Sequence, residues 1–324
     1  MDRRLARVAL FFCCLISGAR AATPVETHGD LRVEGNRVVD RSGNPASLAG
    51  CSFFWSQWKG QYWNADCVRW LCDDWRVDIV RASMGVEEGG YLAEPAREKA
   101  KVTTVVDAAI ACGVYVIIDW HDHHAEKHSR EAVAFFQEMA RKYGRRPNVI
   151  YEIYNEPQEA AWKETVKPYA EQVIAAIRAI DPDNLIVVGT PRWSQDVDLA
   201  AADPIQAKNV AYALHFYAGS HRERLRDKAV AAMKQGAALF VTEWGTCNAD
   251  GNGPVAAESV NAWMIFLRTW QLSHCNWAVS DKNETASIVI PAANPHGGWS
   301  EHDLTNSGKL ARRWIRSWSE HPER

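Results

Sequence analysis

Residues 148–158 read NVIYEIYNEPQ, a run of β-branched and aromatic residues that breaks off in Asn-Glu-Pro. The residues up to Tyr154 favour an extended, buried segment. Because Pro157 cannot donate to a sheet ladder, we predict that the strand stops near Glu156. A carboxylate therefore stands at the tip of a buried strand.

A second stretch, AALFVTEWGT at residues 237–246, repeats this pattern. Its apolar run also ends on a carboxylate, Glu243, which is followed by an aromatic residue and a glycine. Two acids that are placed alike on two strands indicate a functional pair. Whether the two side chains can meet depends on how the strands between them are arranged.

The composition is that of an ordinary globular protein. The chain has 324 residues, is 47% hydrophobic and carries a formal net charge of -3. Such a chain can bury a large core, and its balanced charge gives no sign of nucleic-acid binding. Length alone does not decide between one domain and two, because α/β barrels reach about 250 residues as a single domain.

The first 21 residues have the pattern of a secretory signal peptide. Three arginines precede an apolar run over residues 8–16, and Ala19 and Ala21 form an A-x-A cleavage site. The apolar run is shorter than the roughly 20 residues that span a bilayer. We therefore expect a secreted, extracellular protein without a membrane partner.

Cysteines in an oxidising compartment predict disulfide bonds. Removal of the signal peptide would leave an even number of them, and the pattern predicts roughly one to three bridges. The sequence does not choose among the pairings, although Cys67 with Cys72 and Cys247 with Cys275 would each join nearby segments. The other two cysteines are Cys51 and Cys112.

Beyond a short hairpin pattern at residues 31–50, strand and helix patterns alternate along the chain. The strands are nearly continuous apolar runs, as expected of a parallel sheet that is covered on both faces. We predict a single (β/α)8 TIM barrel with a short N-terminal β-hairpin, and a doubly wound open sheet is the alternative. The predicted strands are 47–54, 77–83, 114–120, 148–156, 185–190, 210–217, 237–244 and 275–281, and the predicted helices are 67–75, one ending at 112, 129–143, 165–180, 197–202, 222–235, 254–273 and 307–318.

Polar side chains gather at the carboxyl ends of these strands, which meet on one rim of such a barrel. Taken singly, each is more often a structural residue than a catalytic one. Titratable groups at the same end of several strands are not what chance would give, so the cluster indicates an active site. Its members are Arg81, His121, Asn155, Glu156, His215, Tyr217, Glu243 and Trp277.

Two glutamates across a rim with a cation beside them suit glycoside cleavage, in which one acid protonates the leaving oxygen and one carboxylate attacks the anomeric carbon. We expect Arg81 to lower the pKa of one glutamate, which stays ionised, while the less compensated one keeps its proton longer. The high tryptophan content fits, because sugar rings stack on indole faces. A zinc site at His121 and His123 is an alternative from another class of hydrolase.

The motifs DWHDHHA, YEIYNEPQ, GTPRWSQDVD, HFYAGSH, VTEWGT and NWAVSDKNE follow one another at the predicted strand tips. Together they resemble glycoside hydrolase family 5, in particular its bacterial-type endo-β-1,4-glucanases (cellulases). The resemblance implies that residues 22–324 form one catalytic barrel domain, without a cofactor or a metal. We expect a monomer whose substrate is cellulose, β-glucan or glucomannan.

Residue by residue, the resemblance makes Glu156 the general acid/base and Glu243 the nucleophile of a retaining double displacement. Arg81 and Tyr217 would hold the nucleophile, and His215 would lie beside the acid/base. The remaining residues would bind sugar units: His121, Asn155 and Trp277 around the cleaved bond, Lys282, Glu284 and His28 farther away, and Trp58 and Trp193 as stacking platforms.

The chain departs from the family pattern in two places. Phe53 stands where many relatives have histidine, and Gly85 where an aromatic residue is common. β-Mannanase or xylanase activity on the same fold therefore stays open, as does a noncatalytic glycan-binding protein. The complete set of Arg81, Glu156 and Glu243 argues against the last of these.

Overall fold

The computed structural model describes residues 21–318 and contains the predicted barrel. Eight parallel strands close into a ring in the order β10-β3-β4-β5-β6-β7-β8-β9, so that the last strand pairs with the first. The alternative of an open doubly wound sheet is thereby excluded. The strands are β3 (Ala49–Phe53), β4 (Ile79–Gly85), β5 (Tyr115–His121), β6 (Val149–Glu152), β7 (Ile186–Val188), β8 (Val210–Tyr217), β9 (Leu239–Gly245) and β10 (His274–Val279).

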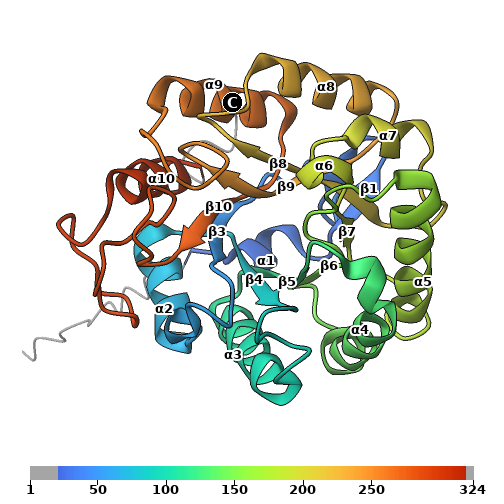
Figure 1. Cartoon of the computed structure of the whole chain (residues 1–324), viewed down its shortest axis with the longest axis horizontal. Helices are drawn as coiled ribbons and strands as arrows, with labels where there is room; N and C mark the ends of the chain where they lie inside the picture. Colours follow the sequence, from blue (N-terminus) through green and yellow to red (C-terminus); the bar gives the residue numbers. More distant parts are fainter. Residues whose placement is uncertain (1–20, 319–324) are drawn as a thin grey trace, which may run out of the picture.

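Helices form a layer around the strands (Figure 1). Most of them follow the predicted pattern of one helical segment after each strand, and α4 and α7 have the predicted bounds. The main helices are α2 (Ala65–Trp70), α3 (Pro95–Cys112), α4 (Ser129–Tyr143), α5 (Lys167–Arg178), α7 (Val197–Ala202), α8 (Glu223–Lys234), α9 (Ala257–Trp270) and α10 (Asn306–Arg316). The short segments are α1 (Pro24–His28), α6 (Pro191–Ser194), η1 (Gly60–Tyr62), η2 (Leu71–Trp75), η3 (Ala125–His128) and η4 (Trp162–Val166).

The apolar residues divide into an outer and an inner core. The outer core fills the space between strands and helices, and its aromatic members include Phe216, which stacks on Trp263 with ring centroids 3.8 Å apart. The inner core fills the barrel with side chains such as Ile117, Val187 and Phe240. The barrel is therefore packed along its axis, and an open site can form only at its ends.

A two-stranded antiparallel hairpin, β1 (Arg32–Glu34) and β2 (Arg37–Val39), covers the amino-terminal end of the barrel. Leu31 and Val38 from this region belong to the inner core, together with Ile79 and Tyr115 at the beginnings of β4 and β5. The predicted hairpin is thus present and closes one end. Only the carboxyl end of the barrel remains for a substrate.

Strand β6 is shorter than predicted. It ends at Glu152, whereas the sequence places its end near Glu156. The ladder with β7 stops with Glu152 opposite Val187, and residues beyond this point leave the sheet. Glu156 therefore lies on the loop above the strand rather than at its last position.

None of the helices in the part of the chain that the structure describes is long and apolar enough to cross a membrane. The predicted signal peptide falls on residues 1–21, of which 1–20 lie outside the described residues. All six cysteines of the described part are free thiols, so the one to three disulfide bonds expected from the sequence are not formed in this structure.

Candidate active site

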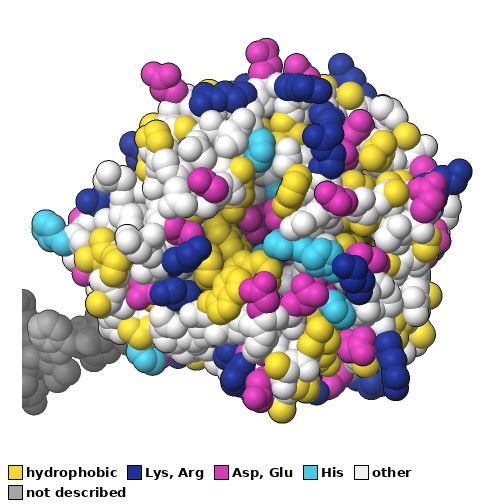
Figure 2. All heavy atoms as spheres, in the orientation of Figure 1, with side chains coloured by type: hydrophobic (Ala, Val, Ile, Leu, Met, Phe, Trp, Pro, Cys, Tyr) yellow, Lys and Arg dark blue, Asp and Glu magenta, His cyan; other side chains and the backbone are white. Residues whose placement is uncertain are grey.

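The predicted site residues meet at the carboxyl end of the barrel. Figure 2 shows a hollow in the middle of this view, with acidic, hydrophobic and histidine side chains gathered in and around it. A pocket of about 550 Å³ on one side of the hollow is lined by Glu156, His215, Tyr217 and Trp193, among others. Side chains from β4, β5, β8, β9 and β10 and from the loops after them form the rest of the site.

Arg81 on β4 is the central cation of the site. It is completely buried and faces three carboxylates at once. Its Nε donates to Glu152 Oε2 at 2.7 Å, its Nη1 to Glu243 Oε2 at 2.8 Å, and its Nη2 lies 3.0 Å from Asp119 Oδ2. A buried guanidinium is tolerated only when it is paired in this way, and in turn it fixes the geometry of its partners.

Glu243 is held from two sides. Besides the bond from Arg81, Tyr217 donates its hydroxyl to Glu243 Oε1 at 2.7 Å. Burial, followed by the charge of Glu243, raises the pKa of Tyr217 and keeps the hydroxyl protonated as a donor. Both carboxylate oxygens are therefore oriented before any ligand arrives, as the resemblance implies for Arg81 and Tyr217.

Glu156 lies between two histidines. His215 Nδ1 is 2.9 Å from Glu156 Oε1, and His123 Nε2 is 3.4 Å from Oε2. On its other side, His215 Nε2 is 2.8 Å from the hydroxyl of Thr242, whose own proton goes to Glu152 at 2.7 Å. The hydroxyl is thus an acceptor for His215, so Nε2 of His215 carries a proton, while Nδ1 and Glu156 Oε1 share a second one.

The two catalytic candidates face each other at short range. An oxygen of Glu156, an oxygen of Glu243 and a nitrogen of His215 all lie within 4.8 Å of one another. Carboxyl groups about 5–5.5 Å apart are typical of retaining glycosidases, whereas inverting enzymes leave a wider gap for water. The separation fits direct attack by one carboxylate.

The pKa values of the two glutamates shift in directions opposite to those expected from the sequence. Burial alone would raise the pKa of Glu156, but hydrogen bonds from His123 and His215 outweigh it and the pKa is lowered. For Glu243, burial and then the charge of Glu156 raise the pKa, although His215 and Arg81 oppose them. The reason is that Arg81 is shared among three acids, whereas two histidines surround Glu156.

His215 is the group next to Glu156 that can hold the proton needed for catalysis. Burial would lower the pKa of His215, but the nearby carboxylates of Glu152 and Glu156 raise it to about 9. Because Nδ1 and Oε1 are 2.9 Å apart, this proton can pass to Glu156 without rearrangement. Glu156 and His215 together therefore hold one proton over the neutral range.

An aromatic wall lines another part of the site, around His121. Trp277 stacks on the ring of His121 with centroids 5.1 Å apart, and Trp55 meets the same ring edge-on at 4.1 Å. His121 Nδ1 is 2.7 Å from Asp119 Oδ2, which fixes the ring. Sugar faces can stack against such a wall while its polar edges provide hydrogen bonds.

Asn155 offers an unused donor next to the reacting groups. Its Oδ1 accepts from Arg81 Nη2 at 2.6 Å, which orients the amide. Among the described residues its buried Nδ2 has no hydrogen-bond partner. A buried donor without a partner is costly unless a ligand completes it, so Asn155 is placed to bind a sugar hydroxyl.

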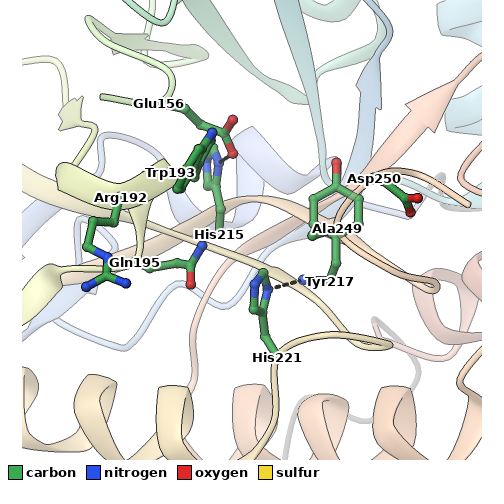
Figure 3. Close-up of a pocket in the computed structure, with 9 residues that line it drawn as sticks. All are labelled: Glu156, Arg192, Trp193, Gln195, His215, Tyr217, His221, Ala249 and Asp250. Carbon is green, nitrogen blue, oxygen red and sulfur yellow. Dashed lines mark hydrogen bonds and ion pairs between the residues drawn. The ribbon is translucent and has the colours of Figure 1, made fainter. Parts of the chain in front are cut away.

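The loop after β7 forms the far wall of the pocket. Three successive residues of this loop, 192–194, have positive φ angles of 56°, which cost about 1 kcal/mol or more each outside glycine. Hydrogen bonds hold the loop against the segment after β6: Trp193 N donates to Pro157 O at 3.0 Å, and Ser194 Oγ to Asn155 O at 2.7 Å. The strain places Trp193, which is 46% exposed, close to Glu156 (Figure 3).

Sequence reasoning missed part of this pocket. Arg192, Gln195, His221 and Asp250 also line it, and Figure 3 shows them around the space beside Glu156 and Tyr217. His221 Nδ1 accepts from the backbone N–H of Tyr217 at 2.8 Å, so its Nε2 is the protonated nitrogen. The motif HFYAGSH contains this histidine. Its position four residues after Tyr217 could have indicated that the two residues lie close together.

The residues expected at more distant positions occupy loops around the rim. Lys282 Nζ is 2.5 Å from Glu284 Oε2 and lies over the ring of Phe54, which in turn contacts Trp277. Trp58 is 47% exposed and adjoins Phe54 and Trp55. These residues therefore extend the aromatic wall away from the glutamate pair.

His28 does not join the site. It lies at the end of α1 and lines a cavity at the amino-terminal end of the barrel, where its Nδ1 is 3.4 Å from Asp40 Oδ2. The covering hairpin and the packed barrel interior separate this end from the glutamates. The sequence could not show at which end the leading segment packs.

The zinc alternative loses its proposed ligands. His121 bonds to Asp119 and His123 approaches Glu156, so the two rings serve different carboxylates. Within residues 21–318, the two groups with metal-compatible spacing are Glu87 with Asp122 and His128, and Glu156 with His215 and Glu243. Neither group contains His121 or His123.

The two departures from the family pattern have local packing reasons. Phe53 is completely buried and packs against Trp63 with centroids 5.7 Å apart, so it belongs to the core and not to the groove. A side chain at Gly85 would meet Gln57, because an added Cβ would lie 1.8 Å from Gln57 Oε1. Gln57 thus takes the space that an aromatic residue would need.

Comparisons with known proteins show which family the chain belongs to. Residues 39–283 match the family model described as cellulase (glycosyl hydrolase family 5). The chain belongs to glycosyl hydrolase family 5. Among curated relatives, this family member is 55% identical to Endoglucanase Z of Dickeya dadantii, over 95% of the chain and 70% of that protein. It is 43% identical to an endoglucanase of Clostridium saccharobutylicum, over 96% of the chain and 71% of that protein.

Solved structures of family members superpose closely on this one. A protein of Cytophaga hutchinsonii, 54% identical, aligns over 91% of this chain and 97% of its own with a TM-score of 0.90. The catalytic domain of endoglucanase Cel5A of Thermobifida fusca is 34% identical. It aligns over 91% of this chain and 100% of its own with a TM-score of 0.88. A Glu→Gln variant of the same Thermobifida fusca domain has been solved in complex with cellotetraose.

Proposed function

We propose that this protein is an endo-acting β-1,4-glucanase that cleaves cellulose and related β-glucans with retention of configuration. Membership of family 5 and relatives named endoglucanase support the reaction and the substrate class. The observation that supports the mechanism is the distance of no more than 4.8 Å between oxygens of Glu156 and Glu243.

In the proposed mechanism Glu243 is the nucleophile. Arg81 and Tyr217 hold its two oxygens, so the carboxylate needs no reorganisation when it attacks the anomeric carbon. Glu156 protonates the leaving oxygen, and His215 supplies the proton across their hydrogen bond. In the second step Glu156 accepts a proton from water, which then releases the sugar from Glu243.

The substrate groove gives each remaining residue a place. Asn155 Nδ2 donates to a hydroxyl beside the reacting carbon, and Trp277 with His121 forms the stacking face on the glycone side. The pocket at Trp193 takes the leaving-group side. Lys282, Glu284 and Trp58 bind glucosyl units farther from the cleaved bond.

The stereochemistry of the product tests this mechanism. We expect proton NMR during hydrolysis of a cello-oligosaccharide to show the β-anomer first, with the α-anomer appearing only through mutarotation. Initial appearance of the α-anomer would show that water attacks directly and would remove the role given to Glu243.

A panel of polysaccharides, tested with the purified protein, measures the substrate preference. Carboxymethylcellulose and mixed-linkage glucan are expected to be cleaved faster than glucomannan, xylan or crystalline cellulose, with a rapid fall in viscosity because the attack is internal. Faster cleavage of a mannan or of xylan would contradict the proposed substrate preference, although it would not affect the proposed retaining mechanism.

The pH profile follows from the protonation states. Glu243 must be ionised, so kcat/KM should fall as the pH drops through its raised pKa. The pair of Glu156 and His215 must hold one proton, so kcat/KM should fall about tenfold per pH unit above about 9. The measurement is kcat/KM on a soluble cello-oligosaccharide across the stable pH range.

The variant His215→Asn tests which group causes the fall of kcat/KM at high pH, the alkaline limb of the pH profile. Without the imidazolium the proton must reside on Glu156 alone, so the limb should move to lower pH. His128→Asn is the matched control, because His128 is hydrogen-bonded to Asp122 and is not in contact with Glu156. An alkaline limb that stays at the same pH in His215→Asn would contradict the proton-sharing role.

The cellular location is also a proposal. We infer from the N-terminal pattern that residues 1–21 direct secretion and are removed, and that residues 22–324 act as a monomeric extracellular catalytic domain. The intact mass of protein from the culture medium, with its elution volume in size-exclusion chromatography, tests both statements.

A further inference from the structure

Cys72 and Cys112 are neighbours although they are far apart in sequence. Cys72 lies in η2, and Cys112 is the last residue of α3. The two side chains line the same cavity at the amino-terminal end of the barrel, and each shifts the pKa of the other. The sequence alone does not choose this pairing from the others that the cysteines allow.

The surroundings of the two thiols favour thiol chemistry. Both side chains are partly exposed, whereas Cys51, Cys67, Cys247 and Cys275 are buried. The neighbouring Cys72 thiol lowers the pKa of Cys112 to about 7, so that a thiolate forms near neutral pH. An exposed thiolate beside a second thiol is the arrangement that reacts by disulfide exchange.

We propose that Cys72 and Cys112 form a disulfide bond that staples η2 to the end of α3. The oxidant is a disulfide such as oxidised glutathione. The Cys112 thiolate attacks it to form a mixed disulfide and releases one thiol, and the Cys72 sulfur then displaces the second. Two protein thiols lose two electrons and two protons, and one oxidant disulfide becomes two thiols.

The staple would stabilise the βα unit that contains Arg81. It closes a loop of about 40 residues, which includes β4 and nearly all of α3. Closing a loop of this length restricts the unfolded chain, so the unfolding temperature should rise by roughly 5 °C. The turnover number should stay the same within about twofold, because the cysteines and the glutamates lie at opposite ends of the barrel.

The experiment uses the full chain incubated with oxidised or reduced glutathione. After alkylation of free thiols and digestion without reductant, mass spectrometry should find one cross-linked peptide that joins Cys72 to Cys112 in the oxidised sample. Thermal unfolding of the same samples should show the rise in unfolding temperature on oxidation. Activity on carboxymethylcellulose should be equal in both.

Variants separate the staple from other effects of oxidation. Cys72→Ala and Cys112→Ala should each abolish the temperature difference between oxidised and reduced samples, whereas the control Cys67→Ala, five residues from Cys72, should keep it. Free thiols at both positions after oxidation would overturn the proposal. So would a bond from either cysteine to another partner, or a temperature difference that persists in Cys72→Ala.

Discussion

Glu243→Gln is expected to lower kcat by on the order of 10⁴-fold or more, since the amide cannot attack the anomeric carbon. The replacement keeps the shape of the side chain and one acceptor for the hydroxyl of Tyr217, but its amide nitrogen cannot accept from Arg81, so the free energy of unfolding should fall by about 1–3 kcal/mol. Steady-state kinetics on a cello-oligosaccharide, together with thermal unfolding, measures both quantities.

Glu156→Gln is the matched comparison for the other glutamate. With a natural substrate it should lose activity on a similar scale, but with a dinitrophenyl cellobioside the first step needs no proton, and the glycosyl-enzyme should still form. Azide tests the assignment directly: it should restore turnover of Glu243→Ala with an α-glycosyl azide as product, and of Glu156→Ala with a β-glycosyl azide. The opposite products would exchange the two roles.

Arg81→Met should damage both stability and activity. Three buried carboxylates, Asp119, Glu152 and Glu243, would lose their shared cation, and a buried charge left without its partner costs about 3–5 kcal/mol. The carboxylates would respond by taking up protons, so Glu243 would be protonated at neutral pH and kcat would fall. Chemical unfolding and kcat at several pH values check these two effects.

The control for this variant is Arg312→Met. Arg312 forms a two-pronged pair with Asp74 through bonds of 2.7 Å, but both side chains are partly exposed. Exposed pairs are worth about 1 kcal/mol or less, so this variant should be slightly destabilised and fully active. Equal unfolding free energies for the two variants would show that Arg81 is not the central cation described above.

The sequence predicts the barrel and most of the site because both depend on local patterns. Each strand is a continuous apolar run between turn residues, and each catalytic candidate stands at or just beyond the end of such a run. Parallel strands in a closed ring must bring these ends to one rim. Glu156, Glu243, Arg81, Tyr217 and His215 accordingly meet as the resemblance implies.

Long-range pairing was the part that the sequence could not give. Glu152 looks like an ordinary polar position of an alternating strand, and only the bond to Arg81, 71 residues away, reveals it as part of the site. The same limit reversed the expected protonation of the two glutamates, because the flanking histidines of Glu156 come from separate strands and loops. His28 shows that a motif does not state which end of a barrel it joins.

The pairing of β10 with β3 has a consequence for biosynthesis. Trp58 follows the first barrel strand and Trp277 lies on the last, yet both border the same groove. In a ribosome-bound chain that lacks β10, the barrel cannot close between β10 and β3, and the groove is incomplete. We expect catalytic competence to arise in one step once β10 has emerged, so partly synthesised molecules should be inert toward glucans inside the producing cell.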